Sequence, residues 1–220
     1  MGHVLAQLIP VALAAALSTV PITATLFILL SERRRTTALP FLSGWVIGTV
    51  AALVLAIVAA QALPGRPRGF SSLADNLEIL VGSALILFGL YTLVRRRRTP
   101  TGGAGWIEGI GSLGPLPLLG LGLALNLRPK AVLLVVAAGL AISGAPPGVD
   151  DVDTLILIAV YTAIATSTVL VPTLATVFFP ERMEPRLVVA RDWVDAHGTA
   201  VTGVVVILVG VVVLAAGISG

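Results

Sequence analysis

The stretch LALNLRPKAVLL, residues 123–134, places two cations on either side of a proline inside a long apolar run. The run covers 116–143, which is long enough for a helix to cross about 30 Å of hydrocarbon. Pro129 interrupts that helix because it has no amide hydrogen to donate. Arg128 and Lys130 together cost about 5–7 kcal/mol at bilayer depth on insertion scales. The stretch therefore predicts a broken membrane-spanning helix whose cations are either paired or exposed to a wet cavity.

The rest of the chain has the composition of an integral membrane protein. Of its 220 residues, 57% are hydrophobic and 11% are charged, with a mean hydropathy of +1.04. Such a chain has too few polar residues to cover a soluble domain. The first apolar run has no Lys or Arg before it, which favours a retained span over a cleaved signal peptide. We predict an all-α integral membrane fold with six spans, at 4–30, 41–63, 76–94, 116–143, 154–179 and 194–217.

The basic residues predict the orientation of these spans. The first, third and fifth loops hold ten cations, the second loop holds two and the fourth holds none. Positive loops remain in the cytoplasm, so both termini are expected outside, in a multi-pass protein of the cytoplasmic membrane. Because the arginines gather in loops between spans, the net charge of +3 does not indicate a nucleic-acid partner. Trp45, Trp106 and Trp193 lie near predicted span ends, where an interfacial belt is expected.

Metal, thiol and enzyme chemistry find little support in the sequence. The chain has no cysteine and two histidines, which predicts neither a disulfide nor a metal site. The predicted span centres hold no paired carboxylates and no nucleophile–histidine arrangement. We therefore expect no cofactor and no enzymatic activity.

An internal repeat is indicated by two short segments. GSALILFG at 82–89 aligns without gaps with GVVVILVG at 203–210, and Pro21 and Pro129 each fall within the first span of a half. Halves with three spans each must be inverted relative to one another, as in many secondary transporters. We predict a first repeat at 1–94, a cytoplasmic linker at 95–115 and a second repeat at 116–220. Gly44 and Gly48 predict close helix packing.

Polar residues in three spans predict a substrate site. We expect it to be formed by nine residues: Ser18, Thr19, Pro21, Asn126, Arg128, Pro129, Lys130, Thr166 and Ser167. A polar cavity with positive charge favours a carboxylate, phosphate or sulfate group. The alternative is a purely structural ion pair, in which Glu78 or Asp75 neutralises the cations.

Two longer stretches resemble a known family. ALSTVPITATLFILLSERRRTTALPFLSGWVIGTV at 16–50 and NLRPKAVLLVVAAG at 126–139 are similar to the glycopeptidolipid-addressing and sulfolipid-addressing proteins of actinobacteria, in the L-lysine exporter superfamily. The resemblance implies two three-helix repeats, export of cell-envelope glycolipids and roles for Pro129, Lys130 and Asn126. This chain has Ser18-Thr19 where the family has Ser-Pro, and Arg128 where the family has the Asn of Asn-Pro-Lys. The added Arg128 favours a more anionic substrate.

Together these features predict a secondary transporter that exports an anionic amphiphile such as a cell-envelope glycolipid. Two alternatives stay open: a small-solute exporter for amino-acid-like molecules, and an accessory scaffold that binds envelope-biosynthesis proteins. Membrane lipids are expected partners, and the small residues of the spans allow a homodimer.

Overall fold

A computed structural model describes residues 2–62, 73–95, 113–144 and 150–219 of the chain. The described part is helical apart from short connections, which confirms the all-α membrane class. Its elements are α1 (Gly2–Ala16), α2 (Thr19–Leu30), α3 (Arg34–Gln61), α4 (Leu73–Arg95), α6 (Pro115–Ala124), the 3-10 turn η2 (Leu125–Leu127), α7 (Pro129–Ser143), α8 (Asp151–Phe178) and α9 (Pro180–Ser219).

Four of these helices are individually long and apolar enough to cross a membrane: α3, α4, α8 and α9. Two bent pairs of helices are also long and apolar enough to cross a membrane when each pair is taken together. The pair α1–α2 bends by 47° and the pair α6–α7 by 66°. The number of spans is therefore four, or up to six if each bent pair is one span. The predicted linker at 95–115 lies almost wholly outside the described residues.

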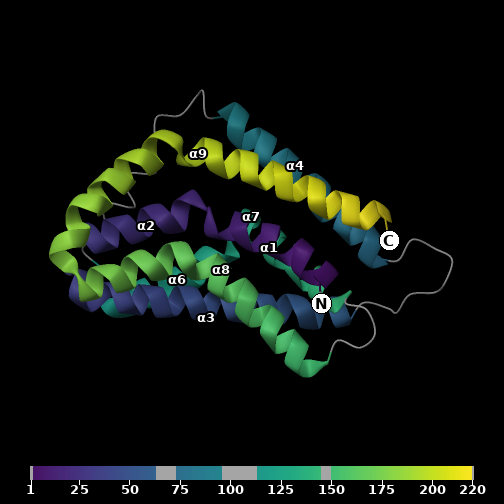
Figure 1. The fold of residues 1–220 in the computed structure, drawn as a ribbon, viewed down its shortest axis with the longest axis horizontal. Coiled ribbons are helices and arrows are strands. Elements are labelled where there is room, and N and C mark those ends of the chain that lie inside the picture. Colours follow the sequence, from purple (N-terminus) through teal and green to yellow (C-terminus); the bar gives the residue numbers. More distant parts are fainter. Residues whose placement is uncertain (1, 63–72, 96–112, 145–149, 220) are drawn as a thin grey trace.

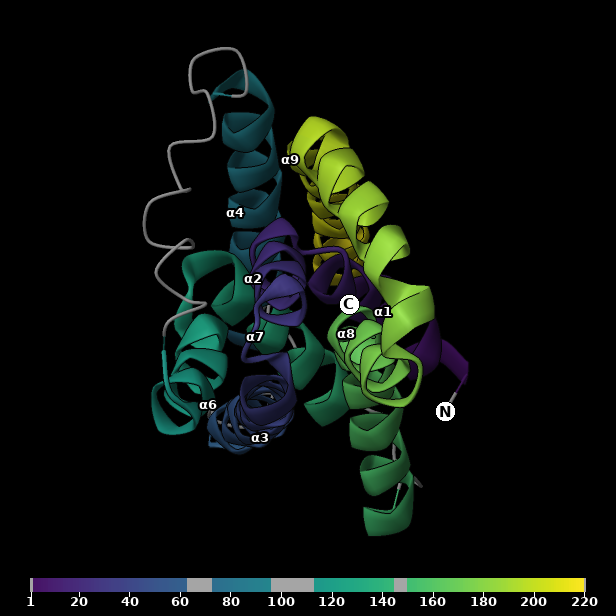
Figure 2. The same ribbon diagram turned by 90° about the vertical axis from the view of Figure 1, so that its left-hand side faces the viewer.

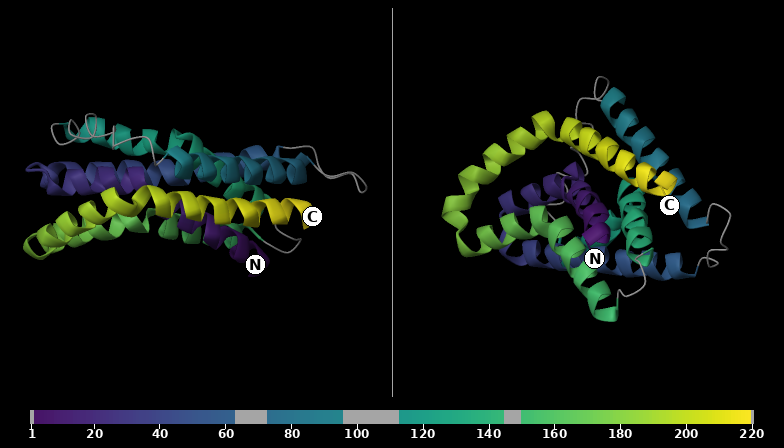
Figure 3. Two further views of the ribbon diagram at one scale, coloured as in Figure 1. Left: turned by 90° about the horizontal axis from the view of Figure 1, so that it is seen from above. Right: turned by 45° about the vertical axis from the view of Figure 1, so that its right-hand side comes forward.

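The helices run broadly along one axis (Figure 1). α4 and α9 lie side by side on one face, and α1 and α2 run between them and the layer that contains α3 and α8 (Figures 2 and 3). The N- and C-terminal ends lie toward the same end of this bundle, and the α2–α3 and α8–α9 junctions lie at the other (Figure 1).

Glycines bring several of these helices into close contact. A Cβ on Gly44 of α3 would fall on the carbonyl oxygen of Leu119 in α6, and a Cβ on Gly122 would lie 2.6 Å from the backbone nitrogen of Trp45. The close packing predicted at Gly44 is thus confirmed.

The aligned glycine segments of α4 and α9 pack on each other reciprocally. A Cβ on Gly82 would lie 2.9 Å from the oxygen of Gly210, and a Cβ on Gly89 would lie 2.9 Å from the oxygen of Gly203. In the alignment Gly82 corresponds to Gly203 and Gly89 to Gly210. Each contact is therefore the image of the other, as in an isologous interface.

The expectation of a loop between the fifth and sixth spans is wrong, because 180–186 is helical. Pro180 occupies the first helical position, where its missing amide hydrogen costs nothing. α9 runs for 40 residues, about 60 Å at 1.5 Å per residue, twice the thickness of the hydrocarbon. Its charged first part therefore extends beyond the hydrocarbon, while Leu187 and Val194 pack into the apolar cluster of α2 and α3.

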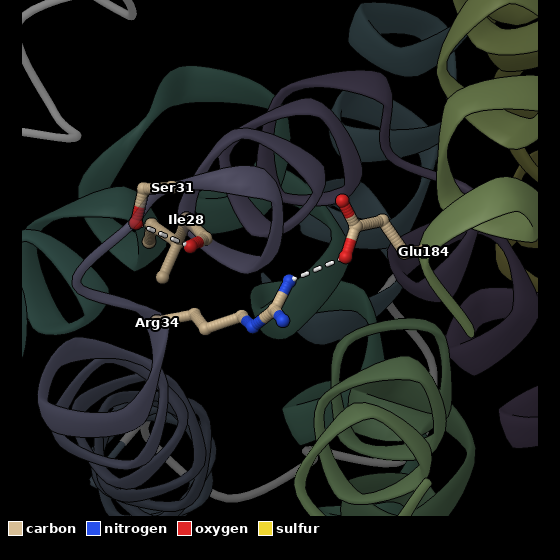
Figure 4. Close-up of polar contacts among 4 residues, drawn as sticks. All are labelled: Ile28, Ser31, Arg34 and Glu184. Carbon is tan, nitrogen blue, oxygen red and sulfur yellow. Dashed lines mark hydrogen bonds and ion pairs between the residues drawn. The ribbon is translucent and has the colours of Figure 1, made fainter. Parts of the chain in front are cut away.

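An ion pair joins this first part of α9 to the start of α3. Arg34 donates from its guanidinium to Glu184 over 3.1 Å, beside the turn in which Ser31 donates to the oxygen of Ile28 (Figure 4). The basic segments predicted to share one side of the membrane, after the first and fifth spans, thus lie at the same end of the bundle.

Candidate functional site

The break between α1 and α2 exposes carbonyls that the neighbouring helices satisfy. Thr168 of α8 donates to the oxygen of Ala16 over 2.7 Å, and Thr202 of α9 donates to the oxygen of Leu17 over 2.8 Å. Pro21 lies in the first turn of α2, where a proline is tolerated. Hydroxyls therefore support a non-helical segment in the interior, as hydrocarbon surroundings require.

The second break lies between α6 and α7. Arg128 is extended, with φ −69° and ψ 147°, and Pro129 is the first residue of α7. The Nε of Arg128 donates over 3.0 Å to the oxygen of Leu125, one of the carbonyls that the break leaves free. A proline in the first helical position thus stops α6–η2 and starts α7, which explains the bend of the pair.

Asn126 is fixed against α3 at this second break. Thr49 donates its hydroxyl to Oδ1 of Asn126 over 3.1 Å, and Nδ2 of Asn126 donates to the oxygen of Gly122 over 3.2 Å. Gly48 makes room for the amide, because a Cβ there would lie 2.6 Å from Nδ2. The side chain is buried, with 5% of its surface exposed.

The two breaks meet at a small cavity. It offers about 20 Å³ to the centres of water molecules, enough for about one water. Its walls come from α1, α3, the two breaks, α7 and α8, and are formed by Ala15, Ser18, Trp45, Thr49, Asn126, Arg128, Lys130, Ala131, Leu134, Val135, Tyr161 and Ala165.

The N-termini of α2 and α7 adjoin this cavity. Ser18 precedes α2 and Arg128 precedes α7, and neither side chain caps its helix with a hydrogen bond. The uncapped amide hydrogens of a helix N-terminus carry partial positive charge and bind anions. Lys130, the second residue of α7, adds a full positive charge.

Three buried side chains that line the cavity lack a hydrogen-bond partner: Trp45 at Nε1, Lys130 at Nζ and Tyr161 at the hydroxyl. Each can donate a hydrogen bond. Leaving such a group buried and unsatisfied costs about 1–3 kcal/mol, and more for a charge. Among the described residues no carboxylate forms an ion pair with Lys130 or Arg128. The side chain of Asp75, one expected partner, lies outside the described residues.

The structure brings together only part of the predicted site. Ser18, Asn126, Arg128 and Lys130 line the cavity. The hydroxyls of the other three polar candidates make different contacts: Thr19 bonds Thr202 over 2.7 Å, Thr166 donates to the oxygen of Thr162, and Ser167 donates to the oxygen of Ile164. Ser167 instead lines a separate cavity beside Arg186.

Three polar residues of the cavity wall were not among the nine predicted site residues: Trp45, Thr49 and Tyr161. Trp45, which was expected near a membrane interface, is buried inside the bundle with only 5% of its surface exposed, and it forms part of the cavity wall. Trp193 is 53% exposed, and Trp106 lies outside the described residues. The available signal was position: Trp45 lies three residues before the second predicted packing glycine, Gly48, so the two share one face of the helix.

One comparison with known proteins gives a match. A family model described as Sap, sulfolipid-1-addressing protein, matches residues 8–219 of the chain. No curated protein and no solved structure matches it.

Proposed function

Because the chain belongs to the family of Sap, the sulfolipid-1-addressing protein, we propose that it exports an anionic amphiphile across the cytoplasmic membrane. Family membership supports a part in lipid addressing or export. The transport step and the site are proposed from the geometry of the cavity between the two broken helices.

The observation that carries the proposal is the set of three unpartnered donors around one cavity. Together with the two uncapped helix N-termini and Arg128, they form a site rich in donors and positive charge. A sulfate, phosphate or carboxylate group supplies the acceptors that such a site lacks. A protein that only scaffolds other proteins would gain nothing from the cost of leaving these groups unsatisfied.

The reciprocal packing of α4 on α9 supports the inverted repeat. We assign residues 1–94 and 116–220 to two halves related by an axis in the membrane plane, with both termini outside. In such transporters the substrate lies at the midplane between broken helices, and one half rocks against the other.

The test uses purified protein in liposomes and two fluorescent glycolipids that differ only in one group. Sulfatide carries a sulfate on its sugar, and galactosylceramide does not. We expect the protein to accelerate movement of sulfatide between leaflets well above the rate of galactosylceramide. Lys130→Met should abolish the acceleration, whereas Arg182→Gln, which changes an exposed cation of α9, should retain it.

Each alternative has its own result in the same vesicles. Uptake of labelled amino acids without lipid movement would favour the small-solute exporter. Absence of any movement by the purified protein would favour the accessory scaffold. Equal acceleration of sulfatide by the wild type and by Lys130→Met would refute the assigned site.

A further inference from the structure

An apolar groove of about 680 Å³ lies beside the candidate site, on the side of α3 that faces α6 and α7. Small residues dominate its wall, which is formed by Gly48, Ala51, Ala52, Leu55, Ala56, Ala59, Gly120, Leu123, Ala124, Asn126, Leu127, Val132, Val135 and Val136. Asn126 is the one polar side chain among them. The groove is thus suited to hydrocarbon and offers almost nothing to a polar ligand.

Helix packing explains only part of this run of small residues. A Cβ on Gly139 of α7 would lie 2.8 Å from the Cβ of Ala56, so a small residue at position 56 lets the two helices approach. A Cβ on Gly120, in contrast, would meet no atom within 4 Å. Ala51, Ala59 and Ala124 are likewise exposed. The groove is therefore left open at positions where larger side chains would fit.

The groove and the polar cavity share two wall residues, Asn126 and Val135. Asn126, which is hydrogen-bonded to Thr49 and to the oxygen of Gly122, therefore belongs to the wall between the cavity and the groove. A ligand whose charged group lies among Lys130, Trp45 and Tyr161 would reach the groove with its apolar part on the other side of this shared wall.

We propose that this groove holds one alkyl chain of the amphiphile whose anionic head occupies the cavity. The inference rests on the proposed function, and it narrows the substrate of that function to a lipid. The wall that it shares with a donor-rich cavity, at Asn126 and Val135, distinguishes this groove from an ordinary lipid-facing surface. A small solute would need the cavity alone. The groove thus favours the lipid over the amino-acid-like substrate.

The experiment locates the alkyl chain of the lipid by photocrosslinking in nanodiscs that contain the full-length protein. The probe is sulfatide with a photoreactive diazirine near the end of its acyl chain, and the matched probe is galactosylceramide with the same chain. We expect the sulfatide probe to crosslink to α3 within residues 51–59 and to residues 120–136. The galactosylceramide probe should label these segments far less, because it lacks the group that the cavity binds.

Variants separate the groove from the head site. Ala124→Leu fills the groove and should reduce sulfatide crosslinking there about tenfold. Ala163→Leu, the same change at an exposed position of α8 outside the groove, should leave it unchanged. Lys130→Met should also reduce crosslinking in the groove, because the sulfate head of the lipid no longer anchors its alkyl chain there.

Three results would overturn the inference: crosslinks outside the groove, equal labelling by both probes, or no effect of Ala124→Leu. Equal labelling would identify ordinary bilayer lipid as the occupant. If groove crosslinks depend on sulfate and on Lys130 but sulfatide does not move between leaflets, the proposed transport fails while the groove assignment stands.

Discussion

Replacing Lys130 with methionine should stabilise the ligand-free protein while it abolishes sulfatide movement. Lys130 is buried, with 8% of its surface exposed, and its Nζ has no hydrogen-bond partner. A lysine at the centre of a membrane helix costs about 2.5–3.5 kcal/mol on insertion scales. The cavity has room for about one water, which offsets part of this cost. Methionine keeps most of the apolar stem, so we expect a gain of about 1–3 kcal/mol.

The assay is thermal unfolding of the protein in nanodiscs without added anion. For a chain of this size, 1 kcal/mol shifts Tm by about 2–4 °C, so Lys130→Met should raise Tm by about 2–12 °C. The control is Leu134→Met, one turn further along α7, where a fully buried leucine is replaced at nearly constant volume and Tm should fall slightly. Sulfatide should raise the Tm of the wild type and leave that of Lys130→Met unchanged. A Tm of Lys130→Met below that of the wild type would refute the reasoning, because it would show that the ammonium has a stabilising partner.

Three further predictions concern the donors, the packing and the topology. Trp45→Phe and Tyr161→Phe each remove one hydrogen-bond donor and should weaken sulfatide binding at least about tenfold, since a hydrogen bond to a charged group contributes about 1.5–3 kcal/mol. The control variants Trp193→Phe and Tyr91→Phe, at exposed positions, should bind sulfatide as the wild type does. Gly44→Ala should lower Tm, because its methyl group would fall on the oxygen of Leu119, whereas Gly120→Ala meets nothing within 4 Å and should not lower Tm. The chain has no cysteine, so single cysteines introduced at Glu184 and Ile218 report the topology. A membrane-impermeant maleimide added to intact cells should label position 218 and not position 184. The opposite labelling pattern would show that the predicted orientation in the membrane is reversed.

Much of the fold follows from local properties of the sequence. Runs of apolar residues predict membrane helices because hydrocarbon leaves the backbone no other partners. Pro129 predicts the second break for an equally local reason, since it cannot donate to the preceding turn. The start of α9 escaped prediction because Pro180 and the charges that follow suggest a loop, yet proline is well suited to a first helical position.

The site was predicted less completely because it depends on contacts between distant segments. Trp45 is an ordinary membrane residue in the sequence, Tyr161 is one of several polar residues in its span, and only the meeting of α3, α7 and α8 makes their donors converge. Hydroxyls are ambiguous for the same reason. Thr166 donates within its own helix, whereas Thr168, two residues later, supports a break in α1–α2. Periodicity does not separate these roles.

The contacts around the two breaks connect the site to the proposed movement of the halves. The break in the first half is held by Thr168 and Thr202, which belong to the second half. Asn126, beside the break in the second half, is held by Thr49, which belongs to the first. Each broken helix is thus supported by the opposite half. A cavity with room for about one water admits a lipid head only when its walls separate. Displacing one half against the other would change both sets of contacts together, so a movement that opens the cavity would also act on both helix N-termini that adjoin it.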